Sequence, residues 1–240
     1  MGLSSVVKLA RKAIQVGYCG AVIVAAGSAS RMGGVDKVMA DIGGEPMILR
    51  TVRAFAEAEV IREIVIVTRE DLIRPVTALC GKTDKVRAVV AGGKTRQESV
   101  HLGMNALSPQ GKLVAVHDGA RPFASQALID RMVRAGHSFG AAVPAVPLKD
   151  TVKTKKNGIV GQTPDRSSLC AVQTPQVFDF DLLRGALAKA EADGAEITDD
   201  ASAVERMGMT VKIMEGEEQN IKITTPMDLK LAQLIWEDMV

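Results

Sequence analysis

Near-continuous apolar runs alternate with amphipathic helical patterns along most of this 240-residue chain, and that alternation limits the possible folds. Such runs are typical of strands buried on both faces of a parallel sheet. Strand–helix alternation then predicts right-handed βαβ units, and so an α/β fold with a doubly wound, mostly parallel sheet. We expect strands at residues 20–26, 63–68, 86–90, 113–117 and 140–146, and helices between them at 46–58, 71–79, 96–107 and 125–135. Pro46 is expected as a first helical residue, and Ser125 as an N-cap.

Three polar loops directly follow predicted strands, at residues 27–37, 92–99 and 118–122. In doubly wound sheets, ligands bind outside the carboxyl ends of the strands. The three loops are therefore expected to converge on one edge of the sheet and to form a site there.

The first of these loops combines three glycines with two cations. Gly27, Gly33 and Gly34 allow the backbone to approach a ligand closely, and Arg31 and Lys37 can neutralise an anion. The loop lacks the Gly-Lys-Ser/Thr ending of a P-loop, and it fits the Gly-x-Gly-x-x-Gly dinucleotide pattern poorly. Its composition indicates a polyphosphate site, and a glycine-rich turn with two solvated cations is the alternative.

The charge balance excludes a protein that coats nucleic acid without specificity. Lys and Arg number 30 against 28 Asp and Glu, a net charge of +2, and aromatic residues make up 3%. A nucleic-acid coat would show a basic excess, and single-strand binding would need aromatic stacking platforms. A strongly positive site in this chain must therefore be local.

The cysteines and apolar runs bear on compartment and domain organisation. Three widely spaced cysteines without a Cys-x-x-Cys pair favour a reducing cytoplasm over a disulfide framework or a zinc site. No apolar run approaches the ~20 residues of a membrane span. Residues 1–17 carry an apolar stripe at helical spacing and are expected to form a short surface helix, with a membrane-surface or partner contact as the alternative. Residues 18–240 are expected to form a single domain.

The alternation stops at about residue 148, where a polar segment rich in Lys and Thr begins. Asn157-Gly158 between two β-prone arms predicts a hairpin within residues 148–167. A hairpin with so little apolar content is not stable alone, so we expect it to lean on the same hairpin of a second subunit, with a loose excursion as the alternative. Beyond it we expect helices at 181–192 and 199–207, a strand at 210–214, and a last helix opened by Thr225 and Pro226.

Several residues in the other polar loops suit phosphate chemistry. Asp118 ends an apolar run, where a carboxylate can hold nucleotide-bound Mg²⁺, although it can equally order its own turn. Arg121 can clamp an anion or pair with Asp118. Gly93 permits close approach to a flat base, and Ser99 offers a hydroxyl.

Lys222 stands between two isoleucines on a predicted strand, and a lysine in apolar surroundings is unfavourable unless its charge is used or its stem reaches water. The three histidines suggest no Ser–His or Cys–His pair. Attack by a phosphate monoester on the α-phosphorus of a nucleotide fits this inventory, because the nucleophile is already an anion and needs no general base.

The chain resembles the 2-C-methyl-D-erythritol 4-phosphate cytidylyltransferase family from about residue 20 to residue 235. The resemblance lies in Ala25-Ala-Gly-x-x-x-Arg-Met32, Gly92-Gly-x-x-Arg-x-x-Ser-Val100, Val116-His-Asp-x-Ala-Arg-Pro122, Asp150-Thr151, Gln173-Thr-Pro-Gln176, Ile197-Thr-Asp-x-Ala-Ser202 and Asn220-Ile-Lys-Ile-Thr224.

The resemblance implies a Rossmann-like nucleotidyltransferase fold, and a homodimer joined by the hairpin arm at about residues 148–167. It implies transfer of CMP from CTP to methylerythritol phosphate with Mg²⁺. By position, Arg31 and Lys37 would stabilise transition-state charge, Asp118 would lie at the junction of metal and substrate, and Lys222 would orient the acceptor. The cytidine side would be formed by Ala25, Ala26, Gly27, Gly93 and Ser99, and the acceptor side by Thr151, Arg121 and the partner subunit's Arg166.

Two positions depart from the family pattern. Asp36 precedes Lys37 where the family has proline, and Lys94 follows Gly93 where some members carry an acid. A ribitol-5-phosphate cytidylyltransferase and a nucleotide-binding module without turnover are the alternative functions. The Gly119-Ala120 pair disfavours the ribitol enzyme, and the set of cations disfavours the inactive module.

Overall fold

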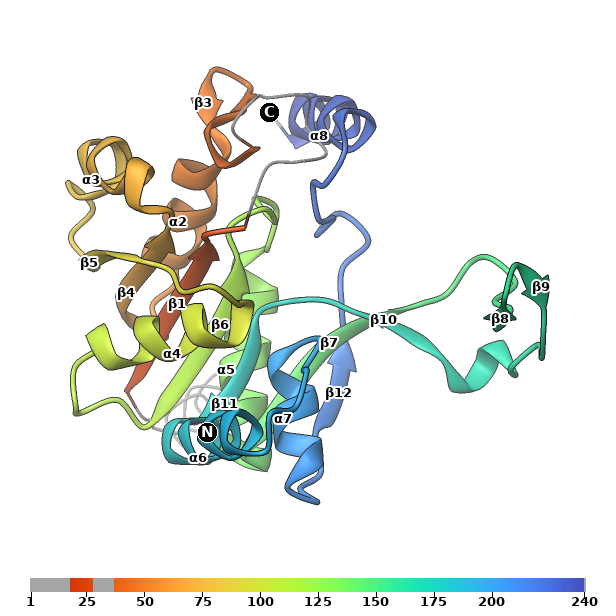
Figure 1. The fold of residues 1–240 in the computed structure, drawn as a ribbon. Helices are drawn as coiled ribbons and strands as arrows, with labels where there is room; N and C mark the ends of the chain where they lie inside the picture. The colour runs from red at the N-terminus through yellow and green to blue at the C-terminus, as the bar shows by residue number, and fades with distance from the viewer. Residues whose placement is uncertain (1–17, 28–36, 240) are drawn as a thin grey trace, which may run out of the picture.

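An eight-stranded mixed sheet forms the centre of the computed structural model, which describes residues 18–27 and 37–239 (Figure 1). Its main path runs β10-β7-β11-β6-β1-β4-β5, and β12 pairs with β7. The strands are β1 (Cys19–Ala25), β4 (Ile61–Thr68), β5 (Val86–Ala91), β6 (Leu113–Asp118), β7 (Ala141–Pro147), β10 (Cys170–Val172), β11 (Gln176–Asp179) and β12 (Lys212–Glu215).

Most of the long strands run parallel, as predicted. β1 pairs in parallel with both β4 and β6, and β4 pairs in parallel with β5. β11 lies antiparallel between β6 and β7, and β10 is antiparallel to β7. The sequence analysis did not predict the short strands β10 and β11, which lie beyond the point where the strand–helix alternation stops.

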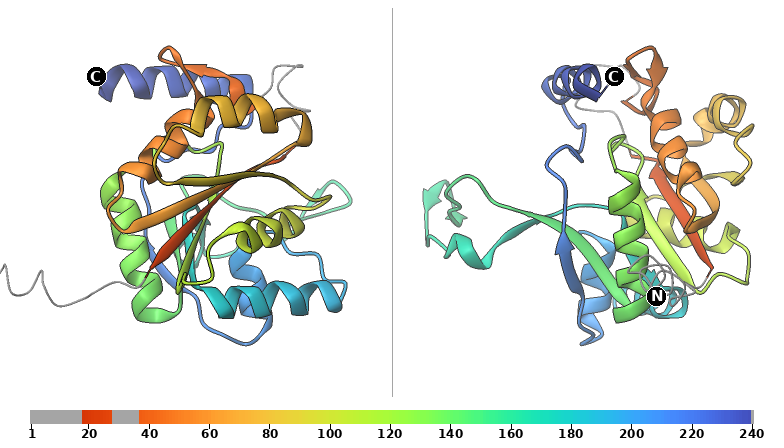
Figure 2. Two further views of the ribbon diagram at one scale, coloured as in Figure 1. Left: turned by 90° about the vertical axis from the view of Figure 1, so that its left-hand side faces the viewer. Right: turned by 180° about the vertical axis from the view of Figure 1, so that it is seen from behind.

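Helices cover both faces of the sheet (Figure 2). Along β1, Ala21 and Ile23 face a core shared with α2 (Met47–Glu57), α3 (Ile73–Cys80) and α5 (Gln126–Phe139). Val22 faces the opposite core, shared with α4 (Arg96–Ala106), α6 (Phe180–Ala192) and α7 (Asp200–Arg206). Successive strand side chains point to opposite faces, so a strand that is covered on both sides has to be apolar throughout.

Most predicted helices form close to their expected bounds. Ser125 caps α5, because its side chain accepts a hydrogen bond from the backbone N–H of Leu128 at 3.0 Å. The expectation for Pro46 was wrong: it lies in the short β3 (Glu45–Pro46), which pairs with β2 (Asp41–Ile42), and α2 begins one residue later. The helix expected from residue 71 starts as a 3-10 turn, η2 (Glu70–Leu72).

The hairpin lies on an arm that projects away from the sheet (Figure 1). β8 (Lys155–Lys156) pairs antiparallel with β9 (Ile159–Val160). Asn157 and Gly158 join them with φ values of 50° and 79°, and positive φ at both central residues is what a type I′ turn requires. The paired strands are shorter than the predicted arms.

The last helix, α8 (Pro226–Met239), packs over the β2–β3 turn and helps to hold the segment before it. Thr225 caps α8 as predicted, accepting from the N–H of Asp228 at 3.2 Å. The segment containing Lys222 is not a strand, contrary to expectation. Ile223 is nevertheless fully buried and donates its N–H to the carbonyl of Ala120 at 2.9 Å, so Lys222 faces the other way.

Part of the predicted organisation lies outside the described residues. This holds for the helix expected within residues 1–17 and for Arg31, Gly33 and Gly34 in the first polar loop. The division into an extension and a single domain remains a prediction. Within residues 18–27 and 37–239, no helix has the length and apolar character that crossing a membrane requires.

Candidate active site

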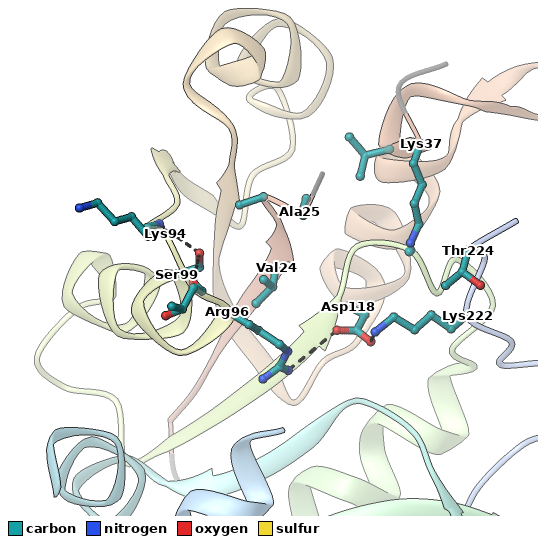
Figure 3. A pocket seen from close by; sticks show the side chains of 15 residues that line it. Val24, Ala25, Lys37, Lys94, Arg96, Ser99, Asp118, Lys222 and Thr224 are labelled. Carbon is teal, nitrogen blue, oxygen red and sulfur yellow. Dashed lines mark hydrogen bonds and ion pairs between the residues drawn. The ribbon is translucent and has the colours of Figure 1, made fainter. Parts of the chain in front are cut away.

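A cavity of about 420 Å³ opens at the carboxyl ends of β1 and β6 (Figure 3). All three polar loops contribute to it, as does the segment before α8. The lining residues are Val24, Ala25, Ala26, Gly27, Lys37, Val38, Gly93, Lys94, Thr95, Arg96, Ser99, Asp118, Ala120, Lys222 and Thr224.

Asp118 is the last residue of β6, and its carboxylate lies on the floor of the cavity among basic side chains (Figure 3). The Lys222 ammonium is 2.8 Å from Oδ2 of Asp118. The Arg96 guanidinium is 3.8 Å from the other carboxylate oxygen, and Nε of Arg121 is 3.6 Å from Oδ2. Lys37, the first residue of η1 (Lys37–Met39), lines the same cavity and lies on the Lys222 side of it (Figure 3).

These cations keep Asp118 ionised. Its side chain is only 11% exposed, and burial alone would raise its pKa. The positive charges of Lys222, Arg96 and Arg121 outweigh burial and lower the pKa of Asp118 to about 2. The carboxylate is therefore a fixed negative charge over the whole physiological range.

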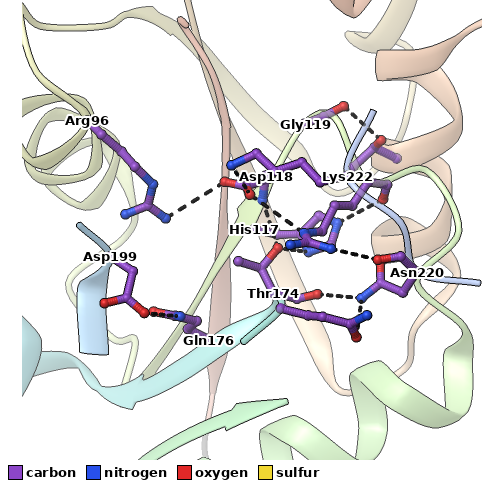
Figure 4. Close-up of polar contacts among 12 residues, drawn as sticks. Arg96, His117, Asp118, Gly119, Thr174, Gln176, Asp199, Asn220 and Lys222 are labelled. Carbon is purple, nitrogen blue, oxygen red and sulfur yellow. Dashed lines mark hydrogen bonds and ion pairs between the residues drawn. The ribbon is translucent and has the colours of Figure 1, made fainter. Parts of the chain in front are cut away.

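A buried hydrogen-bond chain holds Asp118 from behind (Figure 4). Its backbone N–H donates to Oγ1 of Thr174 at 3.1 Å, and that hydroxyl lies 2.9 Å from Nδ1 of His117. Nε2 of His117 lies 3.0 Å from the carbonyl of Arg121 and must donate to it, so the hydroxyl of Thr174 donates to Nδ1. Burial lowers the pKa of His117 to about 4, which keeps the ring neutral and suits it to hydrogen bonding.

The opposite wall is formed by the turn into α4. The N–H of Gly93 donates to Oγ of Ser99 at 3.1 Å, and the Ser99 hydroxyl donates to the carbonyl of Thr95 at 2.9 Å. Glycine is required at position 92, because a Cβ there would collide with Cβ of Ala26. The wall is thus backbone-rich and closely packed.

Eight of the predicted site residues line one cavity: Ala25, Ala26, Gly27, Lys37, Gly93, Ser99, Asp118 and Lys222. Arg121 does not line it. That side chain is buried behind Asp118 and donates from Nη1 to the carbonyl of Asn220 at 2.7 Å. Thr151 and Arg166 lie on the projecting arm, where Nη1 of Arg166 donates to the carbonyl of Lys149 at 2.6 Å.

The sequence analysis did not assign a role to two residues that the structure joins at this site. Nη2 of Arg96 donates to Oδ2 of Asp200 at 2.7 Å, and Arg96 lines the cavity. Both positions fall inside motifs that carry the resemblance, but 104 residues separate them in sequence. Periodicity and local spacing give no signal for a pair that only the tertiary fold brings together.

The cavity suits a divalent cation that arrives with its substrate. Mg²⁺ in nucleotide enzymes is commonly held by one or two carboxylates together with substrate phosphates. Asp118 supplies one ionised carboxylate at the cavity floor, which fits that pattern. Among the residues that the structure describes, no three His, Cys, Asp or Glu side chains gather as a metal cluster.

The fold and the cavity together define a nucleotide-binding protein of the doubly wound α/β class. Comparison with protein families matches residues 19–238 to 2-C-methyl-D-erythritol 4-phosphate cytidylyltransferase. The chain belongs to this family, and it is an enzyme of the nucleotidyltransferase class.

Curated relatives named 2-C-methyl-D-erythritol 4-phosphate cytidylyltransferase, and similar solved structures, match nearly the whole chain. The enzyme from Symbiobacterium thermophilum is 44% identical, over 90% of this chain and 92% of its own length. The one from Geobacillus kaustophilus is 45% identical, over 90% and 95%. The crystal structure of 4-diphosphocytidyl-2C-methyl-D-erythritol synthase from Anaerococcus prevotii is 35% identical, covering 93% of this chain and 98% of that one, with a TM-score of 0.84.

Proposed function

We propose that the protein transfers CMP from CTP to 2-C-methyl-D-erythritol 4-phosphate, giving 4-diphosphocytidyl-2-C-methyl-D-erythritol and pyrophosphate in isoprenoid precursor synthesis. Family membership supports this reaction. The observation that carries it is the gathering of Lys37 and Lys222 around one ionised carboxylate, Asp118, beside a backbone-rich wall. Family membership also favours methylerythritol phosphate over ribitol 5-phosphate as the acceptor.

The chemistry needs positioning and charge compensation more than a general base. An oxygen of the acceptor phosphate attacks the α-phosphorus of CTP, the bond from that phosphorus to the bridging oxygen breaks, and pyrophosphate leaves. The acceptor phosphate and the triphosphate repel each other, so a cluster of cations lowers the barrier. Lys37 and Lys222 would supply that charge, with Arg31 from the loop between residues 27 and 37.

We assign the cytosine ring of CTP to the wall formed by Gly93 and Ser99, and the divalent cation to Asp118. When bound, Mg²⁺ would neutralise phosphate charge and help to orient the reacting groups. Because Asp118 is already ionised, it can hold a cation without first losing a proton. The Lys222 ammonium beside it would keep it turned toward the cavity.

We further propose a cytoplasmic homodimer in which the arm of one subunit completes the site of the other. Thr151 and Arg166 do not line the cavity of their own chain. The arm also exposes Ile159 and Val160, 72% and 66% accessible, and such apolar residues favour a partner surface. For the compartment, the free cysteines Cys19, Cys80 and Cys170 suit reducing conditions.

Turnover is tested by mixing the protein with CTP, Mg²⁺ and either alcohol phosphate, and by measuring pyrophosphate and the cytidylyl product. We expect product with methylerythritol phosphate and little with ribitol 5-phosphate. Preference for ribitol 5-phosphate would overturn the acceptor assignment. Absence of pyrophosphate with every acceptor, despite CTP binding, would indicate a binding module without turnover.

The shared site is tested by complementation between Lys37→Ala and Arg166→Ala, unfolded and refolded together. The assay uses an acceptor concentration far below the KM of Arg166→Ala, so that each variant alone is nearly inactive. If arms serve partner sites, each hybrid dimer has one intact site, and equal mixing should restore about a quarter of wild-type activity. If each arm serves its own chain, the mixture stays inactive. Sedimentation of the mixture verifies that dimers have reformed.

A further inference from the structure

A cation at the start of a helix is an electrostatic liability, and Arg96 is the first residue of α4. The helix N-terminus carries a partial positive charge, so an arginine there is disfavoured unless acids compensate it. Two acids do so. Nη2 of Arg96 is 2.7 Å from Oδ2 of Asp200 and 3.8 Å from Oδ1 of Asp118.

Asp200 does not line the cavity, and its carboxylate points toward Arg96, from which it accepts a hydrogen bond. Figure 4 labels Arg96 and Asp199, the residue that precedes Asp200. It is the first residue of α7, directly after Asp199, which caps that helix. Its side chain is fully buried, and Oδ1 has no hydrogen-bond partner. A buried carboxylate with a single charged hydrogen bond is strongly unfavourable without its cation. The Asp200 carboxylate therefore holds the Arg96 guanidinium in place.

Arg96 and Lys222 approach Asp118 from opposite sides (Figure 3). Lys222 is near one carboxylate oxygen and Arg96 is near the other. With charge on both sides, the carboxylate has a defined orientation at the cavity floor. Without Arg96, the attraction of Lys222 for the Asp118 carboxylate would have no counterpart on the opposite side, and the carboxylate would turn toward Lys222.

We propose that Arg96 is a positioning residue: anchored by Asp200, it sets the orientation of the Asp118 carboxylate for cytidylyl transfer. The inference rests on the proposed function. It differs from a direct substrate contact, in which Arg96 would bind the triphosphate and Asp200 would only add stability.

The test compares Arg96→Gln, Arg96→Lys, Asp200→Asn and the double variant Arg96→Gln/Asp200→Asn. Partners that orient a ligand-holding group typically change activity about 10–100-fold when removed. We expect kcat to fall about 10-fold or more in Arg96→Gln and Asp200→Asn, with KM for CTP within about twofold. Because Asp200 acts through Arg96, the double variant should be no slower than Arg96→Gln.

Two further measurements distinguish a positioning role of Arg96 from a structural role or a substrate-binding role. Nη2 of Arg96 alone approaches both carboxylates. A lysine side chain keeps the charge but is one atom shorter, so its ammonium would be drawn back from Asp118, and the kcat of Arg96→Lys should fall between wild type and Arg96→Gln. CTP affinity without added metal, measured by calorimetry, should stay within about twofold of wild type in all folded variants. The control, Arg134→Gln, breaks the exposed Arg134–Asp130 pair on α5 and should leave every value unchanged.

A rise in KM and in the CTP dissociation constant at unchanged kcat would show that Arg96 binds substrate, and would overturn the proposal. A fall in the kcat of the double variant equal to the product of the two single-variant falls would also overturn the proposal. If Asp200→Asn and Arg96→Gln fail to fold, Arg96→Lys decides, and a wild-type kcat there refutes positioning. A wild-type protein that releases no pyrophosphate refutes the proposed function itself, and the positioning role with it.

Discussion

Lowering the pH from 7.5 to 5 crosses a range in which the protonation of one buried group, the imidazole of His117, differs between the folded and the unfolded chain. The ring is fully buried, and it uses both nitrogens in hydrogen bonds while neutral. Burial lowers the pKa of His117 from 6.5 to about 4 in the folded protein. In the unfolded chain the pKa returns to its ordinary value, so between these two pKa values protons bind the unfolded state preferentially.

The sign and size of the effect follow from that difference. Because the pKa of His117 is lower in the folded protein, its contribution to the unfolding free energy is fully present above pH 6.5 and is lost as the pH falls toward 4. One pKa unit corresponds to about 1.4 kcal/mol, so the whole shift amounts to about 3 kcal/mol. From pH 7.5 to pH 5, the contribution of His117 to the unfolding free energy should fall by about 2 kcal/mol. Asp118, whose pKa is lowered from 3.8 to about 2, contributes almost nothing in this window.

Urea unfolding of wild type and His117→Gln at the two pH values isolates this contribution. The variant will be less stable at pH 7.5, but its pH dependence should be weaker by about 2 kcal/mol, because other groups cancel in the difference. His137→Gln, which removes an exposed histidine on α5, should retain the wild-type dependence. Equal pH dependence in wild type and His117→Gln would refute the assignment of a depressed pKa to this ring.

Four substitutions test the site and the packing of α8 on the turn at Gly43 and Gly44. Lys37→Ala should lower kcat about 10²–10³-fold while CTP binding partly survives, as loss of one preorganised charge contact does elsewhere, and a near-normal kcat would remove Lys37 from the mechanism. Arg166→Ala should mainly raise KM for the alcohol phosphate, and a loss of CTP affinity instead would contradict the arm assignment. Gly43→Ala should lower the unfolding free energy more than Gly44→Ala in urea titrations: both glycines have positive φ, but only at position 43 would a Cβ strike Trp236. Equal losses would contradict that contact.

The local parts of the fold were predictable because their signals are local. An uninterrupted apolar run predicts a doubly covered strand, and β1 and β4 are such strands. Ser125 and the Asn157-Gly158 turn were placed correctly for the same reason: one side chain or two backbone angles determine each feature. The insertion of β11 between β6 and β7 was not predictable, because four residues carry no periodicity and their partners lie far along the chain.

At the site, too, local features were predictable and features that depend on distant contacts were not. Polar loops at the carboxyl ends of strands predicted its position, and the charge of Lys222 is engaged by Asp118, as its isoleucine neighbours suggested. The sequence did not reveal that Arg121 would turn away from the cavity toward the carbonyl of Asn220. Nor did it reveal the pairing of Arg96 with Asp200, since both depend on how α7 and the segment before α8 pack against the sheet.

The charge of the cavity explains how a nearly neutral chain can hold a polyphosphate. The whole chain has a net charge of +2, yet the described lining residues include four basic side chains, Lys37, Lys94, Arg96 and Lys222, and one acid, Asp118. Field lines focus in a cleft with low-dielectric walls, so a local excess attracts an anion that the distant surface does not. Asp200 pairs with Arg96 from outside the cavity, so Arg96 adds little to this excess and the three lysines provide the attraction. Since exposed charges are screened beyond ~10 Å at 0.1 M salt, the attraction acts mainly at short range, where geometry decides which phosphate each cation meets.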